Sequence, residues 1–144
     1  MLHKVFLPAL LSVVMLGGCK DNATQPPPSD AYLRWKALGV HNYSIDQVRT
    51  CFCVDGGQSM RVSIRADTIS SVTRLSDGTS VPPQLAGAYY SVDSLFAIIQ
   101  RGTSDSLVVI YNSQNSYPEK LDINPQLHPI DGGVLYMTSN LVVQ

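Results

Sequence analysis

One stretch in the first half of the chain, residues 43–53 (YSIDQVRTCFC), constrains the fold more than any other. Apolar side chains occur along it at both odd and even positions, as expected of a strand that is covered on both faces. Successive side chains of an extended strand point to opposite faces, so Cys51 and Cys53 share one face and Phe52 takes the other. The stretch therefore predicts an interior strand at the centre of a sheet.

The chain begins with the pattern of a targeting signal. Residues 1–4 carry one lysine and one histidine, an apolar run spans residues 5–16, and Gly17 and Gly18 precede Cys19. The run is too short to cross a bilayer as a mature helix. Small residues before a cysteine resemble the lipobox of bacterial lipoproteins, in which the cysteine becomes the first mature residue and is acylated. An ordinary signal peptide that ends in an incidental cysteine is the alternative.

The expected product is a protein of the bacterial cell envelope. We predict a signal peptide over residues 1–18 and a lipid anchor on Cys19 that holds the protein to a membrane, because two or more acyl chains anchor a protein stably. Lys20, rather than aspartate, follows Cys19. A residue other than aspartate at this position favours the outer membrane over the inner membrane in a cell that has both.

A tether separates the anchor from the folded part. Residues 19–29 are polar and contain three consecutive prolines, which favour an extended and fairly stiff conformation. Residues 30–144 then make one domain. Without residues 1–18 the chain keeps nine basic side chains (ten less Lys4) and eleven acidic ones, a formal charge of −2 with no basic run. Nucleic acid is therefore not an expected partner.

Two helices are expected in this domain. The first spans residues 30–38, capped by Ser29 or Asp30 and ended by Gly39, with a buried face of Ala31, Trp35 and Leu38. The second spans residues 91–101, begins at a Ser91 cap and ends at Gly102. Its buried stripe consists of Val92, Leu95, Ile98 and Ile99.

Six strands complete the prediction, over residues 43–53, 60–65, 68–75, 107–111, 120–124 and 134–143. The clearest alternates Met60, Val62 and Ile64 with polar residues, and Ala66-Asp67 forms a hairpin turn after it. Short turns make consecutive strands antiparallel. The expected fold class is α+β: an antiparallel sheet of about six strands with two helices on one face, in the order helix, three strands, helix, three strands. That order would fit a duplicated unit, although no residues match between the halves.

With these residues in view, the chain resembles a bacterial family known only as domain of unknown function 6174. The resemblance covers about residues 30–140 and rests on Trp35, Gly39, Tyr43, the Cys51-Phe52-Cys53 triplet, the hairpin RVSIRADTISSV, the helix SVDSLFAII, Tyr111, Tyr117-Pro118 and Asp122. It implies an envelope lipoprotein of unassigned activity. The chain departs from the family pattern at Asn112, Ser116 and Gly132-Gly133, so any cation site that acidic residues form there in relatives is lost here.

The Cys51 and Cys53 pair leaves four chemical states open: a disulfide, two buried free thiols, a thiol-redox centre or half of a metal site. Residues two apart in a regular strand lie about 6.6 Å apart, near the upper limit for a disulfide, so a direct bond needs a bend or bulge and would be readily reduced. An oxidising envelope favours the disulfide, which we predict. Zinc would need two more ligands, and only His41 and His128 are available, at no known motif spacing.

The sequence contains no recognisable set of catalytic residues. The acidic residues Glu119, Asp122 and Asp131 and the lone His128 occur in the last third, where His128 reads as a solvated loop residue. Neither a nucleophile elbow nor a glycine-rich phosphate loop occurs. We therefore expect neither an enzyme nor a bound cofactor or metal.

The expected function is that of a non-enzymatic binding or structural module, with another envelope protein as a possible partner. The long irregular segment 76–90 would provide a loop surface, and the last strand, through Val142 and Val143, a free edge for strand addition. The alternative is that segment 76–90 and the last strand only pack within the domain and bind nothing. A thiol-redox or metal-handling role of the cysteine pair is the alternative from a different class.

Overall fold

The computed structural model describes residues 27–101 and 105–144. The predicted signal, Cys19 and Gly102 therefore lie outside the described residues. In chain order the elements are α1 Pro28–Ala37, β1 Tyr43–Thr50, β2 Ser59–Arg65, β3 Thr68–Arg74, α2 Pro83–Ala86, α3 Val92–Gln100, β4 Leu107–Tyr111, β5 Pro118–Ile123, the 3-10 helix η1 Pro125–Ile130 and β6 Val134–Val143.

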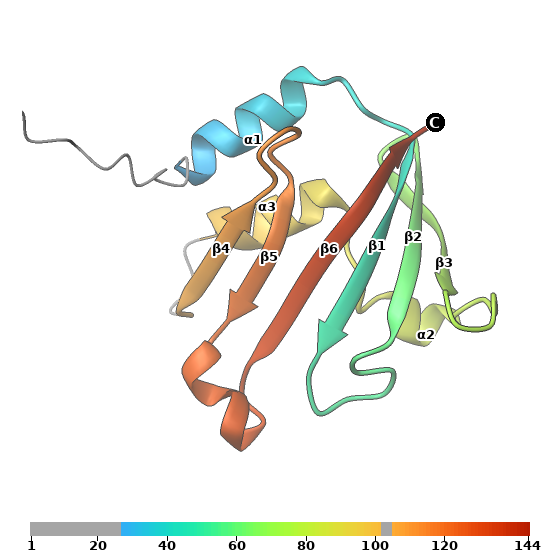
Figure 1. The fold of residues 1–144 in the computed structure, drawn as a ribbon, viewed down its shortest axis with the longest axis vertical. Coiled ribbons are helices and arrows are strands. Elements are labelled where there is room, and N and C mark those ends of the chain that lie inside the picture. Colours follow the sequence, from blue (N-terminus) through green and yellow to red (C-terminus); the bar gives the residue numbers. More distant parts are fainter. Residues whose placement is uncertain (1–26, 102–104) are drawn as a thin grey trace, which may run out of the picture.

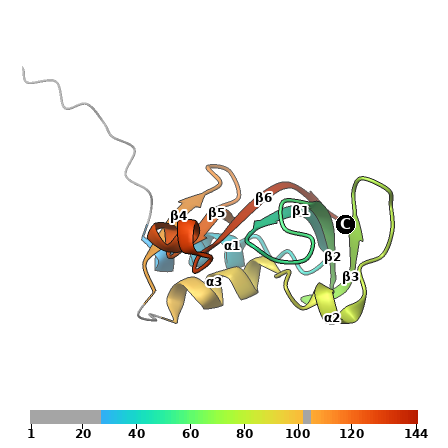
Figure 2. The same ribbon diagram turned by 90° about the horizontal axis from the view of Figure 1, so that it is seen from below.

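The six strands form one antiparallel sheet in the order β3-β2-β1-β6-β5-β4 (Figure 1). The helices α1 and α3 lie on one face of this sheet (Figure 2). The α+β prediction, with its strand number and its interior strand at residue 43, is thus confirmed. The two halves are not copies of one unit, because the strand that follows α1 is central whereas the strand that follows α3 is at the edge.

The free edge predicted for the last strand is present only in the C-terminal part of that strand. β6 lies inside the sheet, paired with β1 along most of its length and with β5 from Val134 to Met137. Only its C-terminal part lacks a strand neighbour on the β5 side. β3 and β4 are the outer strands of the sheet.

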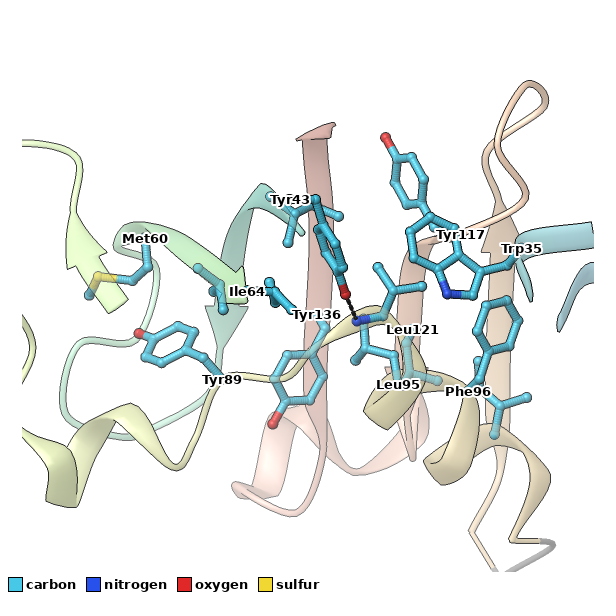
Figure 3. Packing of buried hydrophobic residues seen from close by; sticks show 14 of the residues in the cluster. Trp35, Tyr43, Met60, Ile64, Tyr89, Leu95, Phe96, Tyr117, Leu121 and Tyr136 are labelled. Carbon is cyan, nitrogen blue, oxygen red and sulfur yellow. Dashed lines mark hydrogen bonds between the residues drawn. The ribbon is translucent and has the colours of Figure 1, made fainter. Parts of the chain in front are cut away.

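The core lies between the sheet and the two helices. Met60, Val62 and Ile64 are fully buried, as their alternation predicts. Trp35 is buried too, and its ring meets that of Tyr43 edge-on at 5.5 Å. Figure 3 shows Trp35 and Phe96 toward the α1 side of the core, and Met60 and Tyr89 toward the β3 side. The core therefore extends under both halves of the sheet.

The second helix follows its prediction closely. The Ser91 hydroxyl accepts a hydrogen bond from the Ser94 N–H at 3.2 Å, so the predicted cap is formed. Val92, Leu95 and Ile99 are buried and Ile98 is half-buried. Phe96, which the predicted stripe omits, is fully buried because it lies between the rings of Tyr32 and Tyr111.

Two boundaries differ from the prediction. α1 begins at Pro28, and no side chain caps it; a proline in the first turn has a backbone already set for the helix and has no N–H to satisfy. Leu38 is exposed, because it is the C-cap and Gly39, with φ +61°, turns the chain away after it. The central strand ends at Thr50 rather than residue 53, since residues 51–57 form a turn.

Two buried polar side chains of β1 bind the start of α3 and the connection before it to the sheet. The Tyr43 hydroxyl on β1 accepts a hydrogen bond from the Val92 N–H at 2.9 Å, at the start of α3 (Figure 3). Gln47, fully buried, accepts from the N–H of Tyr90 and donates to its carbonyl oxygen. Residues 76–90, expected as an irregular loop, contain the short helix α2 and are fastened to the sheet at Tyr90.

Truncating the buried stripe of α3 tests this arrangement. We expect Leu95→Ala, at a side chain only 1% exposed, to lower the free energy of unfolding by about 2–5 kcal/mol through lost burial and an unfilled cavity. Leu33→Ala, at 66% exposure on α1, is the matched control and should change it by less than about 0.5 kcal/mol. Urea unfolding followed by the fluorescence of Trp35, the single tryptophan, measures both. Equal losses would contradict the assigned core.

Candidate functional site

The cysteine pair lies in the turn that joins β1 to β2. The sulfur atoms of Cys51 and Cys53 are at disulfide-bonding distance, and their Cα atoms are 5.3 Å apart. This separation is shorter than in a regular strand, because the chain leaves the strand at Thr50 and bends. Phe52, between the cysteines, is 77% exposed, and Val54 is also exposed. The bend that a direct bond requires is therefore present, on the surface.

Hydrogen bonds from the neighbouring strands fix this turn. The Arg49 side chain donates to the carbonyl oxygen of Val54 at 3.1 Å, and the Arg49 carbonyl oxygen accepts from the N–H of Gly57. Arg74 on β3 binds the Asp55 carboxylate at 2.9 Å. At Gly56 a Cβ atom would lie 2.5 Å from the Cys51 carbonyl oxygen, so only glycine fits there. These contacts fix the conformation of the turn.

The turn carries a positive charge that no carboxylate neutralises among the ion pairs of residues 27–101 and 105–144. The Arg49 guanidinium bonds a carbonyl oxygen and lies 5.6 Å from the centre of the Tyr89 ring. Burial raises the pKa of Tyr89 and of Tyr136, so both phenols beside it stay neutral. Asp55, by contrast, is paired with Arg74.

A second group of ionisable side chains comes from the other half of the chain. Asp122 on β5 is buried, and one of its carboxylate oxygens lies 3.0 Å from Nε2 of His128 on η1. The two atoms are close but not aligned for a hydrogen bond. Lys120 reaches the other oxygen at 3.3 Å. His128, expected as a solvated loop residue, is only partly exposed, because η1 folds it back onto Asp122.

Glycine makes room for this histidine. A Cβ atom at residue 133 would lie 2.1 Å from the His128 ring and 2.6 Å from the carbonyl oxygen of Asn124. Asn124 and Asp131, which cap η1 at its two ends, adopt positive φ and so bend the chain sharply. The positions of Asn, Pro, His and Gly between β5 and β6 thus place His128 against Asp122.

The two groups meet at one pocket of about 260 Å³. Its lining residues come from the cysteine turn and from the segment around η1: Thr50, Cys51, Phe52, His128 and Gly133. A half-buried sulfur, an exposed aromatic ring and an imidazole paired with a carboxylate therefore face the same space. The sequence linked His128 to the cysteine pair only as a possible zinc ligand, and it gave no sign that Asp122 lies beside this histidine.

The remaining candidates lie elsewhere. His41 precedes β1, at the opposite end of that strand from the cysteines, and contacts the Asp67 carboxylate at 2.9 Å. Glu119 accepts a hydrogen bond from the Asn112 side chain, and Asp131 is exposed. Within the part of the chain that the structure describes, no three His, Cys, Asp or Glu residues are grouped as a metal site would need.

The two sheet edges differ in protection. Along β3 the backbone of Val72 and Arg74 is hydrogen-bonded by Val81 and Thr79, and a bulge interrupts the pairing with β2 near Ser63. A groove of about 370 Å³ separates this edge from residues 81–89. β4 has the sequence LVVIY, with neither charge nor proline, and its side chains at Val108 and Ile110 are exposed. Across residues 27–101 and 105–144 no segment covers β4, and its pairing with β5 is interrupted by a bulge between Ile110 and Tyr111. β4 is therefore the less protected edge.

Fold and site together define an α+β protein with a six-stranded antiparallel sheet and a cysteine-bearing turn. A family model described as a family of unknown function (DUF6174) matches residues 29–143. The chain belongs to this family, as the resemblance predicts. Neither the curated proteins nor the solved structures include a significant match. Across the described ranges, no helix is both long enough and apolar enough to span a membrane.

The oxidation state of the pair in the cell is directly measurable. We predict that Cys51 and Cys53 are bonded to each other in protein isolated from its native cells, because their Cα atoms already lie at disulfide separation and an envelope compartment would favour oxidation. Alkylation with and without reductant, followed by mass spectrometry, tests this. Labelling of both thiols without reductant would contradict it.

Proposed function

We propose that this protein is a lipid-anchored, non-enzymatic module of the bacterial cell envelope that binds an extended segment of another envelope protein at the edge of β4. The observation that carries the proposal is the apolar edge strand β4, along which residues 107–110 have no described strand on the side away from β5. Proteins shield long apolar edge strands with charges, prolines, bulges or covering segments, since unpaired backbone groups recruit further strands. Residues 79–81 bond to β3, whereas no described segment covers β4, whose pairing with β5 has one bulge, between Ile110 and Tyr111.

The sequence supports the anchor. Residues 5–19 combine the apolar run, the glycine pair and Cys19, and the family match begins only at residue 29. The lipobox-like segment thus precedes the family domain. The described structure starts at Pro27 and enters α1 directly, beside β4 (Figures 1 and 2). The proposed binding edge is therefore next to the point where the tether joins the domain.

The chemistry of β4 indicates the kind of segment that fits. Leu107 and Val109 are half-buried on the helix side, whereas Val108 and Ile110 are exposed on the open side of the sheet. A partner strand would form hydrogen bonds with the backbone groups of β4 that face away from β5. Its side chains would pack beside those of β4 on both faces of the sheet. The matching segment is extended, about five residues long like β4, and rich in β-branched or aromatic residues.

The anchor prediction concerns the mature N-terminus. Protein extracted from membranes should have the mass of residues 19–144 plus acyl chains, because the lipobox-like pattern directs cleavage before Cys19. Intact-mass measurement checks this, and Cys19→Ser is the control that should lose the acyl mass. A water-soluble mature chain without acyl mass would contradict it.

The edge prediction uses two exposed positions on the same face. A photo-crosslinking residue at Ile110, 41% exposed, should give one discrete adduct in cells, because β4 is at the edge. The same residue at Met137, 43% exposed on the interior strand β6, should not. Val108→Lys should abolish the Ile110 adduct, since a charge on an edge strand opposes strand addition.

Hydrogen exchange then separates strand addition from side-chain contact. In the isolated adduct, the β4 amides that face away from β5 should exchange at least about tenfold more slowly than in the free protein, because pairing must break before exchange. Unchanged exchange would contradict strand addition. An adduct of twice the chain's own mass would assign the edge to self-association and contradict the proposal for a second protein.

A further inference from the structure

We propose that the Cys51–Cys53 disulfide exchanges with the thiols of another polypeptide, and that His128 stabilises the Cys51 thiolate that this reaction releases. This inference does not depend on the β4 edge, because the pocket lies where β1 ends and η1 packs. It assigns to the cysteine turn a chemical role beyond binding.

The disulfide is placed for attack rather than for stability. Its ring spans a single intervening residue, so it constrains the unfolded chain less than a bond that closes a long loop. Hydrogen bonds from Arg49 and Arg74 already hold the turn. Cys53 is exposed and Cys51 is half-buried against the pocket. An incoming thiolate therefore reaches the sulfur of Cys53 first.

Charge around the pocket favours a thiolate. Two cationic or potentially cationic side chains, Lys120 and His128, share the single carboxylate of Asp122, and His128 lines the pocket. Cysteines with lowered thiol pKa occur in such electropositive, partly exposed surroundings, and a leaving thiolate of lower pKa departs faster.

The exchange takes place in two steps that conserve atoms and electrons. A substrate thiolate forms a bond to Cys53 Sγ while the Cys51–Cys53 bond breaks, and the electron pair stays on Cys51 Sγ beside His128. A second substrate thiolate then attacks the substrate sulfur of the mixed disulfide and releases Cys53 as a thiolate. The substrate dithiol loses two electrons and two protons, and the cysteine pair gains two of each. In the reverse direction the reduced pair reduces a substrate disulfide.

The exposed apolar side chains at this end suit a polypeptide substrate. Phe52 and Val54 on the cysteine turn and Ile130 on η1 are all exposed. Phe52 also lines the pocket. An unfolded or extended segment with an apolar residue next to its cysteine can place that residue against Phe52 while its sulfur meets Cys53.

The test measures the rate of exchange with a defined probe. The full-length protein in detergent is mixed with a synthetic dithiol peptide that carries an aromatic residue between its cysteines, and samples are acid-quenched for intact mass. A synthetic oxidised peptide of residues 50–58 provides the same disulfide without His128. We expect the protein to be reduced at least about threefold to tenfold faster than this peptide, as a shift of about one pKa unit in the leaving thiol allows.

Matched variants isolate the histidine. His128→Gln should slow the exchange by about the same factor with an unchanged far-UV circular dichroism spectrum, whereas His41→Gln, at the other end of β1, should leave the rate unchanged. If His128→Gln perturbs the spectrum, Lys120→Met provides the second variant. It should also slow the exchange, because it removes the positive charge of Lys120 beside Asp122. A protein that reacts no faster than the 50–58 peptide, or variants that leave the rate unchanged, would overturn the proposal.

Discussion

The hydrogen bond between the Tyr43 hydroxyl and the Val92 N–H joins the two layers of this fold. An N–H in the first turn of a helix has no partner within the helix, and here it is buried. The phenol that accepts it is itself buried, which raises the pKa of Tyr43. Loss of the phenol oxygen would leave a buried donor without a partner at the point where α3 meets the sheet. The position of α3 on the sheet therefore depends on this side chain of β1.

β1 connects this interior constraint to the surface chemistry. Its first residue holds α3, Gln47 in its middle holds both backbone groups of Tyr90, and Arg49 near its end holds the cysteine turn. On its other face, burial alone would raise the pKa of Asp46, but hydrogen bonds from Arg61 and Asn140 outweigh it and lower the value. A single strand thus positions a helix, a long connection and a disulfide.

Periodic patterns predicted most of the fold, because burial on one face repeats every second residue in a strand and every third or fourth in a helix. Met60, Val62 and Ile64 and the stripe of α3 follow that rule. The site was less predictable. His128 reaches Asp122 only because Asn124 and Asp131 take left-handed conformations and Gly133 lacks a side chain. A sequence shows such residues without showing which way the chain turns. The pairing of β6 with β1 is likewise a long-range contact without a local signal.

The separation of α1 from the cysteine turn has a geometric consequence for a tethered protein. α1 lies across the end of the sheet at which β1 begins, and the turn lies at the other end, about 26 Å away along the eight residues of β1 (Figure 1). If the chain is held at Cys19, β4 is the near surface and Phe52 the far one. The domain would then act as a spacer: a partner captured beside the tether stays close to the bilayer, while the sulfur atoms sample polypeptides farther out in the aqueous compartment.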